Sequence, residues 1–378
     1  MKYQTIRTMK KIIIVQHLFG STTAKTQRMM AAAKTYKKEG INVVFIISLE
    51  QKEDLPDSEY KFVIIDEVKQ NKFKCFRQFV AAIKKEYDND SIILFDGAPV
   101  YSFLFPKKKF NVFSEITEIP FFGQKPTLYM RIMEWFRSLG LKHFSGILVI
   151  SNSLKKYYES KGYPKIEVIN MFVDLSRFED LNKTIGNTTK YIGYCGRIST
   201  YKDGVHDLIK AFSVFSKSYP QYSLLLIGGF ENADVEKQLK QQIKDENIEG
   251  KVVFTGVIDA ASLPQLLYDA DILALARPNN RQAQYGFPTK LGEYLATGNP
   301  VVVTKVGDIP EFLYNGDNAY LADPDNYLSF ASSLIECASN EELSHKIGIN
   351  GKKLAFSEFS SVVQAQKALA FMTANLTL

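Results

Sequence analysis

Residues 285–303 read YGFPTKLGEYLATGNPVVV, and this stretch decides the fold. Pro288 suits the first turn of a helix, and Gly298 suits the residue that ends one. The apolar run at 301–304 that follows is short and β-branched, which is typical of a strand buried on both faces of a parallel sheet. The stretch therefore predicts a helix that leads into a strand of such a sheet.

The same alternation of short apolar runs and amphipathic segments extends along the whole chain, and it predicts strand–helix–strand units. Val205, Leu208, Ile209, Phe212 and Phe215, for example, fall at helical spacing. We expect two α/β, doubly wound domains, with strands at 11–16, 43–48, 62–66, 91–96, 111–115, 146–151, 191–195, 223–227, 252–255, 272–276, 301–304 and 319–322.

The domain boundaries follow from composition. Residues 174–189 are rich in Asn, Thr and charge, which is typical of a linker. We therefore expect one domain over residues 1–173, a second over 190–357, and a helix in the terminal segment 358–378 after the second sheet is complete.

Composition and charge limit the possible functions of the chain. The chain has 378 residues, of which 46% are hydrophobic and 23% charged, so it can bury well-filled cores. The formal charge of +6 is uneven: residues 1–170 carry 28 Lys and Arg against 17 Asp and Glu. A basic half suits a nucleic acid, an anionic membrane surface or a phosphorylated substrate. It lacks interleaved stacking aromatics, so we expect no nucleic-acid partner.

Cysteine usage and hydropathy indicate a cytoplasmic protein. The chain has three cysteines, Cys75, Cys195 and Cys337, and no two of them are close in sequence. An odd number of widely spaced cysteines argues for a reducing compartment and against a thiolate metal site. The apolar run at 12–15 is too short for the core of a signal peptide, and no apolar stretch is long enough to span a bilayer.

The loop at 196–204, GRISTYKDG, follows one expected strand and opens a helix. Glycines let the backbone approach a ligand, and Arg197 and Lys202 suit an anion at the carboxyl edge of a parallel sheet. A solvated loop is the alternative. In the stretch quoted first, Lys290 and Glu293 lie near the positive end of the expected helix, where a carboxylate can accept hydrogen bonds from a ribose diol. The alternative for Glu293 is a residue that compensates the helix dipole.

These pieces together resemble the retaining, nucleotide-sugar-dependent glycosyltransferases of the GT-B type, in the large glycosyltransferase family 4 that includes bacterial polysaccharide-assembly enzymes. The matching pieces run in family order over residues 191–313: Gly196-Arg197 with Lys202, Ile227-Gly228-Gly229, Phe254-Thr255-Gly256-Val257, Ala270-Asp271, and Gly286-Phe287-Pro288 to Gly298-Asn299-Pro300-Val301-Val302. The first half matches loosely, through 20–28, 114–118 and 147–174. The resemblance implies two Rossmann-like domains that face each other across a cleft, with the terminal helix returning to the first domain.

The resemblance also implies roles for individual residues. Arg197 and Lys202 would hold the diphosphate of the donor, Glu293 the ribose, and the backbone near Gly228, Gly229, Gly256 and Val257 the base. Two cations and a helix start nearly neutralise a departing nucleoside diphosphate without a metal. The wider donor-binding set is Gly196, Gly229, Gly256, Val257, Tyr285, Gly286, Phe287, Pro288, Thr289, Lys290, Leu291 and Glu293. The nucleotide sugar is a co-substrate, and no cofactor is expected.

Tyr285 departs from the family pattern. The family has a first glutamate seven residues before the position of Glu293, where it contacts the donor sugar, and Tyr285 occupies that place. Tyr285 can make one hydrogen bond and pack on a sugar face, or Gln282 and Gln284 can substitute. The departure keeps two rivals open: a nucleotide-sugar or glycan binding protein without transfer activity, and a sugar-nucleotide epimerase on the same fold.

The first half offers acceptor-side candidates. Glu115 and Glu118 follow an expected strand, and one of them would take the proton of the incoming hydroxyl. Glu118 is the catalytic candidate, and Glu115 is an acceptor-side candidate. Capping of the following segment is the alternative. His17 and Gly20, at the end of the first strand, are further acceptor-side candidates, although a lone histidine is more often an ordinary polar loop residue.

Three Asp-x-Asp triplets, at 88–90, 269–271 and 323–325, do not follow strands as a metal-binding pair would, so we expect no metal site. An apolar helical face runs through Leu128, Ile132, Trp135, Phe136 and Leu139, flanked by Arg131, Arg137 and Lys142 and preceded by lysines at 107–109. Such faces commonly pack into a core. The alternative is an anionic membrane surface, which suits a lipid-linked acceptor and a peripheral location at the inner face of the membrane.

Overall fold

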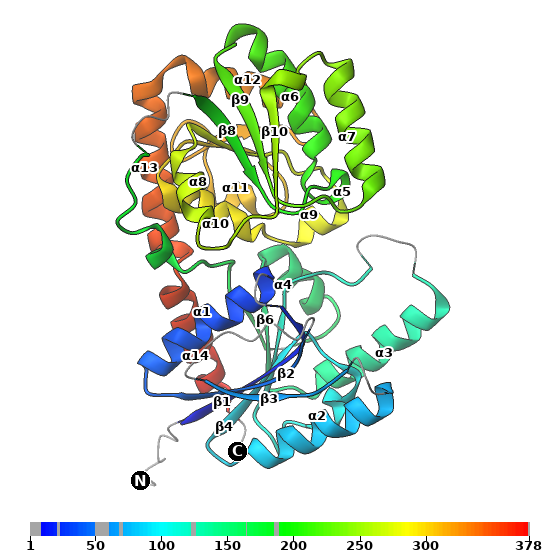
Figure 1. Ribbon diagram of the computed structural model, residues 1–378. Helices are drawn as coiled ribbons and strands as arrows, with labels where there is room; N and C mark the ends of the chain where they lie inside the picture. Colours follow the sequence, from blue (N-terminus) through cyan, green and yellow to red (C-terminus); the bar gives the residue numbers. More distant parts are fainter. Residues whose placement is uncertain are drawn as a thin grey trace. The chain divides into compact units, whose positions relative to one another are not determined.

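The computed structural model describes residues 9–20, 23–49, 60–67, 71–121, 126–163, 165–184 and 189–376. The chain divides into two compact units. Unit 1 comprises residues up to 170 together with those from 361 onward, and unit 2 comprises residues 171–360. Each unit is built on one parallel sheet (Figure 1).

The sheet of unit 1 has the order β3-β2-β1-β4-β5-β6-β7 within the described residues, and every pairing is parallel. Its central strands are buried because their sequences are nearly continuous apolar runs: Ile13 pairs with Val44 on one side and with Ile93 on the other. The strands are β1 (Lys11–Phe19), β2 (Asn42–Leu49), β3 (Lys61–Ile64), β4 (Ser91–Asp96), β5 (Val112–Ile116), β6 (Gly146–Val149) and β7 (Ile166–Val168).

The helices of unit 1 include α1, which connects β1 to β2, and α14, which packs on α1. The terminal helix is therefore part of unit 1, although it follows the second sheet in the sequence. The helical segments are α1 (Ala24–Lys38), α2 (Lys72–Glu86), η1 (Val100–Leu104), α3 (Leu128–Lys142), α4 (Asn152–Glu159) and α14 (Ser361–Ala374).

The sheet of unit 2 has the order β10-β9-β8-β11-β12-β13, and its described pairings are parallel. The order reverses between β8 and β11, and ligands bind at the carboxyl edge of such a switch point. The strands are β8 (Lys190–Cys195), β9 (Tyr222–Ile227), β10 (Val252–Gly256), β11 (Ile272–Leu275), β12 (Val301–Thr304) and β13 (Tyr320–Ala322).

Helices cover both faces of this sheet: α6 packs with α7 and α12, and α10 packs with α8 and α13 (Figure 1). The helical segments are η2 (Leu175–Phe178), α5 (Thr200–Asp203), α6 (Val205–Ser218), α7 (Ala233–Asp245), η3 (Glu249–Lys251), α8 (Leu263–Asp269), α9 (Arg281–Tyr285), α10 (Thr289–Thr297), α11 (Ile309–Phe312), α12 (Tyr327–Ser339) and α13 (Glu341–Glu358). Both units are thus Rossmann-like, as the alternating pattern predicts.

The structure differs from the expected linker. The chain passes from unit 1 to unit 2 after Asn170, and residues 175–178 of the expected linker form η2 within unit 2; residues 185–188 of that linker lie outside the described residues. Strand β7 was not predicted, because it spans three residues with Glu167 at its centre and so lacks an apolar run.

The expected core-facing stripe of the helix near 128–139 is wrong. Helix α3 buries only Gly140 and Leu141 among its residues, whereas Leu128 is 76% exposed and Trp135 is 58% exposed. The exposed apolar side chains of α3 are Leu128, Tyr129, Ile132, Trp135, Phe136 and Leu139. None of the helices in the described part of the chain is long and apolar enough to cross a membrane.

Candidate functional site

Helix α10 places two charged side chains, Lys290 in its first turn and Glu293 in its second, at the edge of the unit 2 sheet. Pro288 is the N-cap, with an extended backbone, and Gly298 ends the helix at φ 81°, a conformation that glycine adopts without a steric penalty. Lys290 and Glu293 are three residues apart, so their side chains lie on one face of α10.

Lys290 is held by the end of β8 and by α5. Its Nζ lies 2.6 Å from Oδ2 of Asp203 and 3.2 Å from the hydroxyl of Tyr194, and it lies over the Tyr194 ring. Burial alone would raise the pKa of Asp203, but the charges of Lys290 and Arg277 outweigh it and leave that pKa below its ordinary value. Asp203 is therefore a buried anion, and it fixes the lysine that the sequence assigns to the donor.

Glu293 has a partner that the sequence did not indicate. Nη1 of Arg177, in η2, donates to Oε1 of Glu293 at 2.7 Å. Burial raises the pKa of Glu293, and Arg177 and Lys290 oppose that rise. The carboxylate thus lies at the sheet edge with an arginine on one of its oxygens.

Glycines line the carboxyl ends of β8, β9 and β10. The amide of Gly196 donates to Ile227 O at 2.9 Å, and the amide of Gly228 donates to Gly256 O at 3.1 Å. A Cβ at Gly196 would collide with the Lys290 side chain, and one at Gly228 would collide with the carbonyl of Gly196. Glycine at 196 therefore leaves room for Lys290, and glycine at 228 lets the ends of β8 and β9 approach each other closely.

Arg197 and Lys202, the cations expected to hold a diphosphate, are exposed at this same edge. Arg197 follows β8, and its Nη2 donates to Glu231 O at 3.2 Å. Lys202 lies in α5, where its amide is capped by Ser199 Oγ at 3.3 Å. Because Asp203 binds Lys290, the helix that carries Lys202 lies against the first turn of α10.

The other donor-side candidates differ in how deeply their side chains are buried. Phe287 packs against Phe312 and Phe359, and Leu291 is fully buried, so both serve the core and offer at most their backbone to a ligand. Val257 is 83% exposed. The candidates Gly229, Tyr285, Gly286, Thr289 and Glu293 are half-buried, and Pro288 is buried.

Of the two glutamines proposed to substitute at the sugar position, Gln282 is buried and Gln284 is exposed. The side-chain amide of Gln284 donates to Asn279 Oδ1 at 3.0 Å. Tyr285 ends α9, one residue before Gly286.

In unit 1, Glu115 is a buried structural anion. The Nε of Arg28 donates to its Oε1 at 2.7 Å, and the same guanidinium donates to the carbonyls of Ile169 and Asn170 at 2.9 and 2.8 Å. The pair therefore fastens α1 to the residues by which the chain leaves unit 1. Glu118, in contrast, is exposed.

His17 is a half-buried ring with both nitrogens engaged. Its Nδ1 contacts Glu67 Oε1 at 2.5 Å, its Nε2 contacts the Tyr101 hydroxyl at 2.6 Å, and the ring stacks on Phe79. Burial lowers the pKa of His17, although Glu67 opposes that effect. Gly20 is buried at the end of β1, next to residues 21 and 22 of the loosely matching 20–28 stretch, which lie outside the described residues.

Asp96 is a titratable group that the sequence analysis missed. It ends β4, its side chain is 2% exposed, and Lys25 Nζ lies 2.6 Å from its Oδ2. Burial raises its pKa to about 6, although Lys25 opposes the rise. Its place at the end of a parallel strand was the signal that could have found it.

The described residues contain no group of three or more His, Cys, Asp or Glu side chains that could hold a metal ion. Carboxylates of the Asp-x-Asp triplets bind protein partners instead: Asp88 binds Ser91, Asp269 binds Thr184, and Asp323 binds Lys305. The three cysteines are free thiols, and Cys75 and Cys337 are buried.

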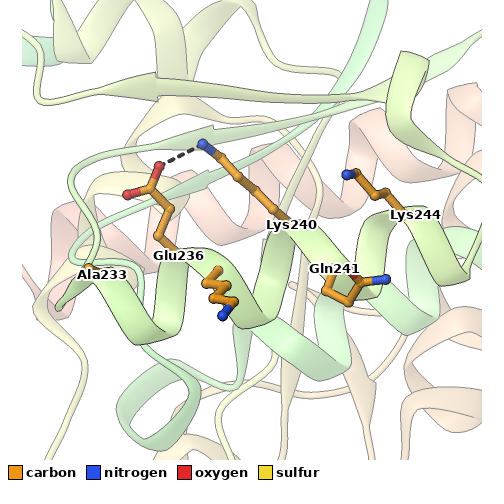
Figure 2. A pocket seen from close by; sticks show the side chains of 6 residues that line it. Ala233, Glu236, Lys240, Gln241 and Lys244 are labelled. Carbon is orange, nitrogen blue, oxygen red and sulfur yellow. Dashed lines mark hydrogen bonds and ion pairs between the residues drawn. The ribbon is translucent and has the colours of Figure 1, made fainter.

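A surface hollow runs along α7, as Figure 2 shows. Its lining residues are Ala233, Glu236, Lys237, Lys240, Gln241 and Lys244, and Glu236 pairs with Lys240 at 2.6 Å. All of them come from one helix, so the hollow is a strip of solvated helix surface.

Comparison with known proteins gives a family match over part of the chain. Residues 177–354 match the family model of glycosyl transferases group 1. Mannosylfructose-phosphate synthase of Agrobacterium fabrum is 29% identical over 197 residues, which are 51% of this chain and 42% of that protein. The capsular polysaccharide biosynthesis glycosyltransferase CapM of Staphylococcus aureus is 28% identical over 50% of this chain and 48% of its own length. The chain spans about half the length of these curated relatives.

Among solved structures, Anabaena Alr3699/HepE in complex with UDP superposes with a TM-score of 0.77. The match covers 96% of this chain and 100% of that one, at 20% identity. The likeness shows the fold, GT-B with two Rossmann-like domains. Residues 177–354, which include Gly196, Gly228, Gly256, Arg197, Lys202 and Glu293, match a glycosyl transferases group 1 domain.

Proposed function

We propose that the protein is a glycosyltransferase that moves a sugar from a nucleoside-diphosphate donor to a hydroxyl group of a glycan or lipid-linked glycan, with retention, in cell-surface polysaccharide synthesis. The observation that carries the proposal is the edge of unit 2, where the exposed Arg197 follows Gly196 and the exposed Lys202 lies in α5, which Asp203 joins to Lys290 of α10. Arg197 and Lys202 would bind the diphosphate, and Glu293 would accept hydrogen bonds from the ribose.

The charges suit that assignment. A departing nucleoside diphosphate carries about two to three negative charges, and two cations with roughly half a charge from the helix start nearly neutralise it. Lys290 contributes less to this balance, because Asp203 already neutralises it. The ligand of HepE and the family match support a UDP-sugar as the first donor to test.

For the acceptor we propose unit 1. Glu118 is an exposed carboxylate beyond the end of β5, and it would accept the proton of the attacking hydroxyl. Glu115 is unsuited to contact with the acceptor, since Arg28 holds it in the interior. His17 and Gly20 would contribute by shaping the end of β1.

Release of nucleoside diphosphate from a panel of sugar nucleotides tests the proposal. Transfer, or slow hydrolysis without acceptor, releases the diphosphate. A binding protein releases none, and an epimerase alters the sugar while the diphosphate stays attached. Glu118→Gln should lower turnover in the presence of acceptor and leave donor binding unchanged.

We further propose that α3 rests on an anionic membrane surface. Its exposed apolar residues include Trp135, and the exposed Arg131 and Lys142 lie on the same helix. The amide of Lys107 donates to His143 O at 2.9 Å, which puts the lysine turn at 107–109 beside the end of α3. Aromatic and basic residues together favour the interface of an anionic bilayer.

Co-sedimentation with vesicles tests this surface. Vesicles containing phosphatidylglycerol should bind the protein, salt should weaken binding, and pure phosphatidylcholine should bind it less. Trp135→Ser with Ile132→Ser should abolish binding, whereas the matched pair Leu328→Ser with Leu343→Ser, exposed in unit 2, should not. Self-association detected by ultracentrifugation and removed by the α3 changes would assign the surface to a second copy instead.

A further inference from the structure

Arg177 is fixed within unit 2 from several directions. It lies in η2, whose N-cap Asp174 accepts from the amide of Ser176 at 3.2 Å. Its Nη1 donates to Glu293, its Nη2 donates to Ala260 O at 3.3 Å, and its guanidinium lies 5.9 Å from the ring centre of Phe178. The ring of Phe178 is buried, so it provides a fixed support for the guanidinium.

The contact leaves most of the carboxylate available. An ionised carboxylate has about four lone-pair sites on two oxygens. Within the described residues Arg177 is the hydrogen-bond donor to Glu293, and it engages Oε1 alone. About three sites remain, two on Oε2 and one on Oε1, which is enough for two adjacent hydroxyl groups.

The contact between Arg177 and Glu293 also affects the protonation of Glu293. Burial raises the pKa of Glu293, and a protonated carboxyl would lose one of its acceptor sites. Arg177 is the larger of the two charges that oppose this rise, ahead of Lys290. The arginine therefore helps to keep the half-buried Glu293 ionised, so that both of its oxygens can accept hydrogen bonds.

We propose that Arg177 is a positioning residue for ribose recognition: it holds the Glu293 carboxylate in the orientation that accepts the 2′- and 3′-hydroxyl groups of the donor nucleotide. The inference rests on the proposed function, because it needs a nucleotide at this edge. It predicts that Arg177 affects the choice between ribose and deoxyribose and not the general strength of diphosphate binding.

A purely structural role makes a different prediction. If Arg177 only tied η2 to α10, its loss would weaken all nucleotides equally, or lower stability alone. Ribose discrimination is thus the readout that separates the two roles.

The experiment is calorimetric titration of the full chain with UDP, GDP and ADP and with their 2′-deoxy counterparts. The variants are Arg177→Gln, Arg177→Lys, Glu293→Gln and the double variant Arg177→Gln/Glu293→Gln. Lys240→Gln is the matched control, since it removes a cation from an ion pair of similar length, 2.6 Å, on the exposed side of α7 (Figure 2). Thermal denaturation of each variant checks folding.

We expect the wild type to prefer the ribonucleotide about tenfold, the magnitude of one charge-assisted hydrogen bond. Arg177→Gln should remove most of this preference, Arg177→Lys should restore part of it, and Lys240→Gln should retain it. The double variant should lose no more discrimination than Glu293→Gln alone, because Arg177 acts through Glu293.

The outcomes distinguish two failures. If the wild type binds none of the diphosphates, the proposed function fails and the inference fails with it. If it binds one and Arg177→Gln weakens the ribo and deoxy forms by the same factor, the inference alone is overturned. Full discrimination in Arg177→Gln overturns it as well.

Discussion

Lys290 and Asp203 form a buried ion pair, with 2.6 Å between Nζ and Oδ2 and side chains that are 14% and 3% exposed. The pair joins α10, which carries Glu293, to α5, which carries Lys202. The lysines proposed for the donor site are therefore not equivalent: Lys202 is exposed, whereas Lys290 is neutralised within the protein.

Asp203→Asn should destabilise unit 2. It leaves the buried Lys290 without its counter-charge, and breaking such a pair costs about 3–5 kcal/mol of unfolding free energy. The folded pKa of Asp203 is lowered, so its contribution is present above the unfolded pKa of about 4 and is lost as pH falls through the folded pKa.

Thermal denaturation at pH 7 and near pH 3 checks this. The difference between wild type and Asp203→Asn should be large at pH 7 and smaller in acid. Asp245→Asn, an exposed position on α7, is the control. Equal melting temperatures at pH 7 would show that the pair contributes little to stability.

Arg197→Ala and Lys202→Ala should lower turnover by orders of magnitude and leave the melting temperature nearly unchanged. Both side chains are exposed, so folding does not depend on them, while each close contact with a diphosphate is worth about 4 kcal/mol before desolvation at an effective dielectric constant near 20. Release of nucleoside diphosphate and thermal denaturation are the measurements. Lys244→Ala is the control, and a matching loss of stability would make the two residues structural.

Because of Asp96, the free energy of unfolding should fall as pH rises. Its pKa of about 6 in the folded chain lies above the unfolded value of about 4, so the folded state binds the proton more tightly. The stabilisation is complete below about pH 4 and is lost as pH rises through about 6.

Asp96→Asn, which is neutral throughout, should lack this component. Its melting temperature relative to the wild type should therefore increase between pH 4 and pH 8, by the equivalent of about 2–3 kcal/mol. Parallel pH profiles for the two proteins would show that Asp96 has an ordinary pKa.

Activity should survive a chelator. In the proposed function, Arg197, Lys202 and the start of α10 would supply the positive charge that a divalent ion otherwise provides. The assay is diphosphate release with and without EDTA, followed by added Mg²⁺ or Mn²⁺. Dependence on a divalent ion would contradict this account of the leaving group.

Much of the fold was predictable because strands buried on both faces are apolar runs, as at 91–96 and 301–304, where the predicted and observed bounds agree. Helix α10 was predictable from its end residues Pro288 and Gly298. Strand β7 was not predictable, because a strand of three residues centred on Glu167 is too short to show a hydrophobic pattern.

The site was predictable only where its residues are close in sequence. Gly196, Arg197 and Lys202 lie in one short stretch of sequence, and Lys290 and Glu293 are three residues apart on α10. Arg177 reaches Glu293 across 116 positions and Arg28 reaches Glu115 across 87, so no local pattern indicates either pair. The exposure of the apolar face of α3 was not predictable either, because an apolar stripe has the same sequence pattern whether it faces a core or solvent.

The most direct test of the central claim is a crystal structure of the protein soaked with the sugar nucleotide or nucleoside diphosphate that binds it best. We predict the diphosphate between the Arg197 guanidinium and the Lys202 amine at the start of α10, with the ribose hydroxyl groups on Glu293. A nucleotide bound elsewhere, with these three side chains turned into solvent, would contradict the account.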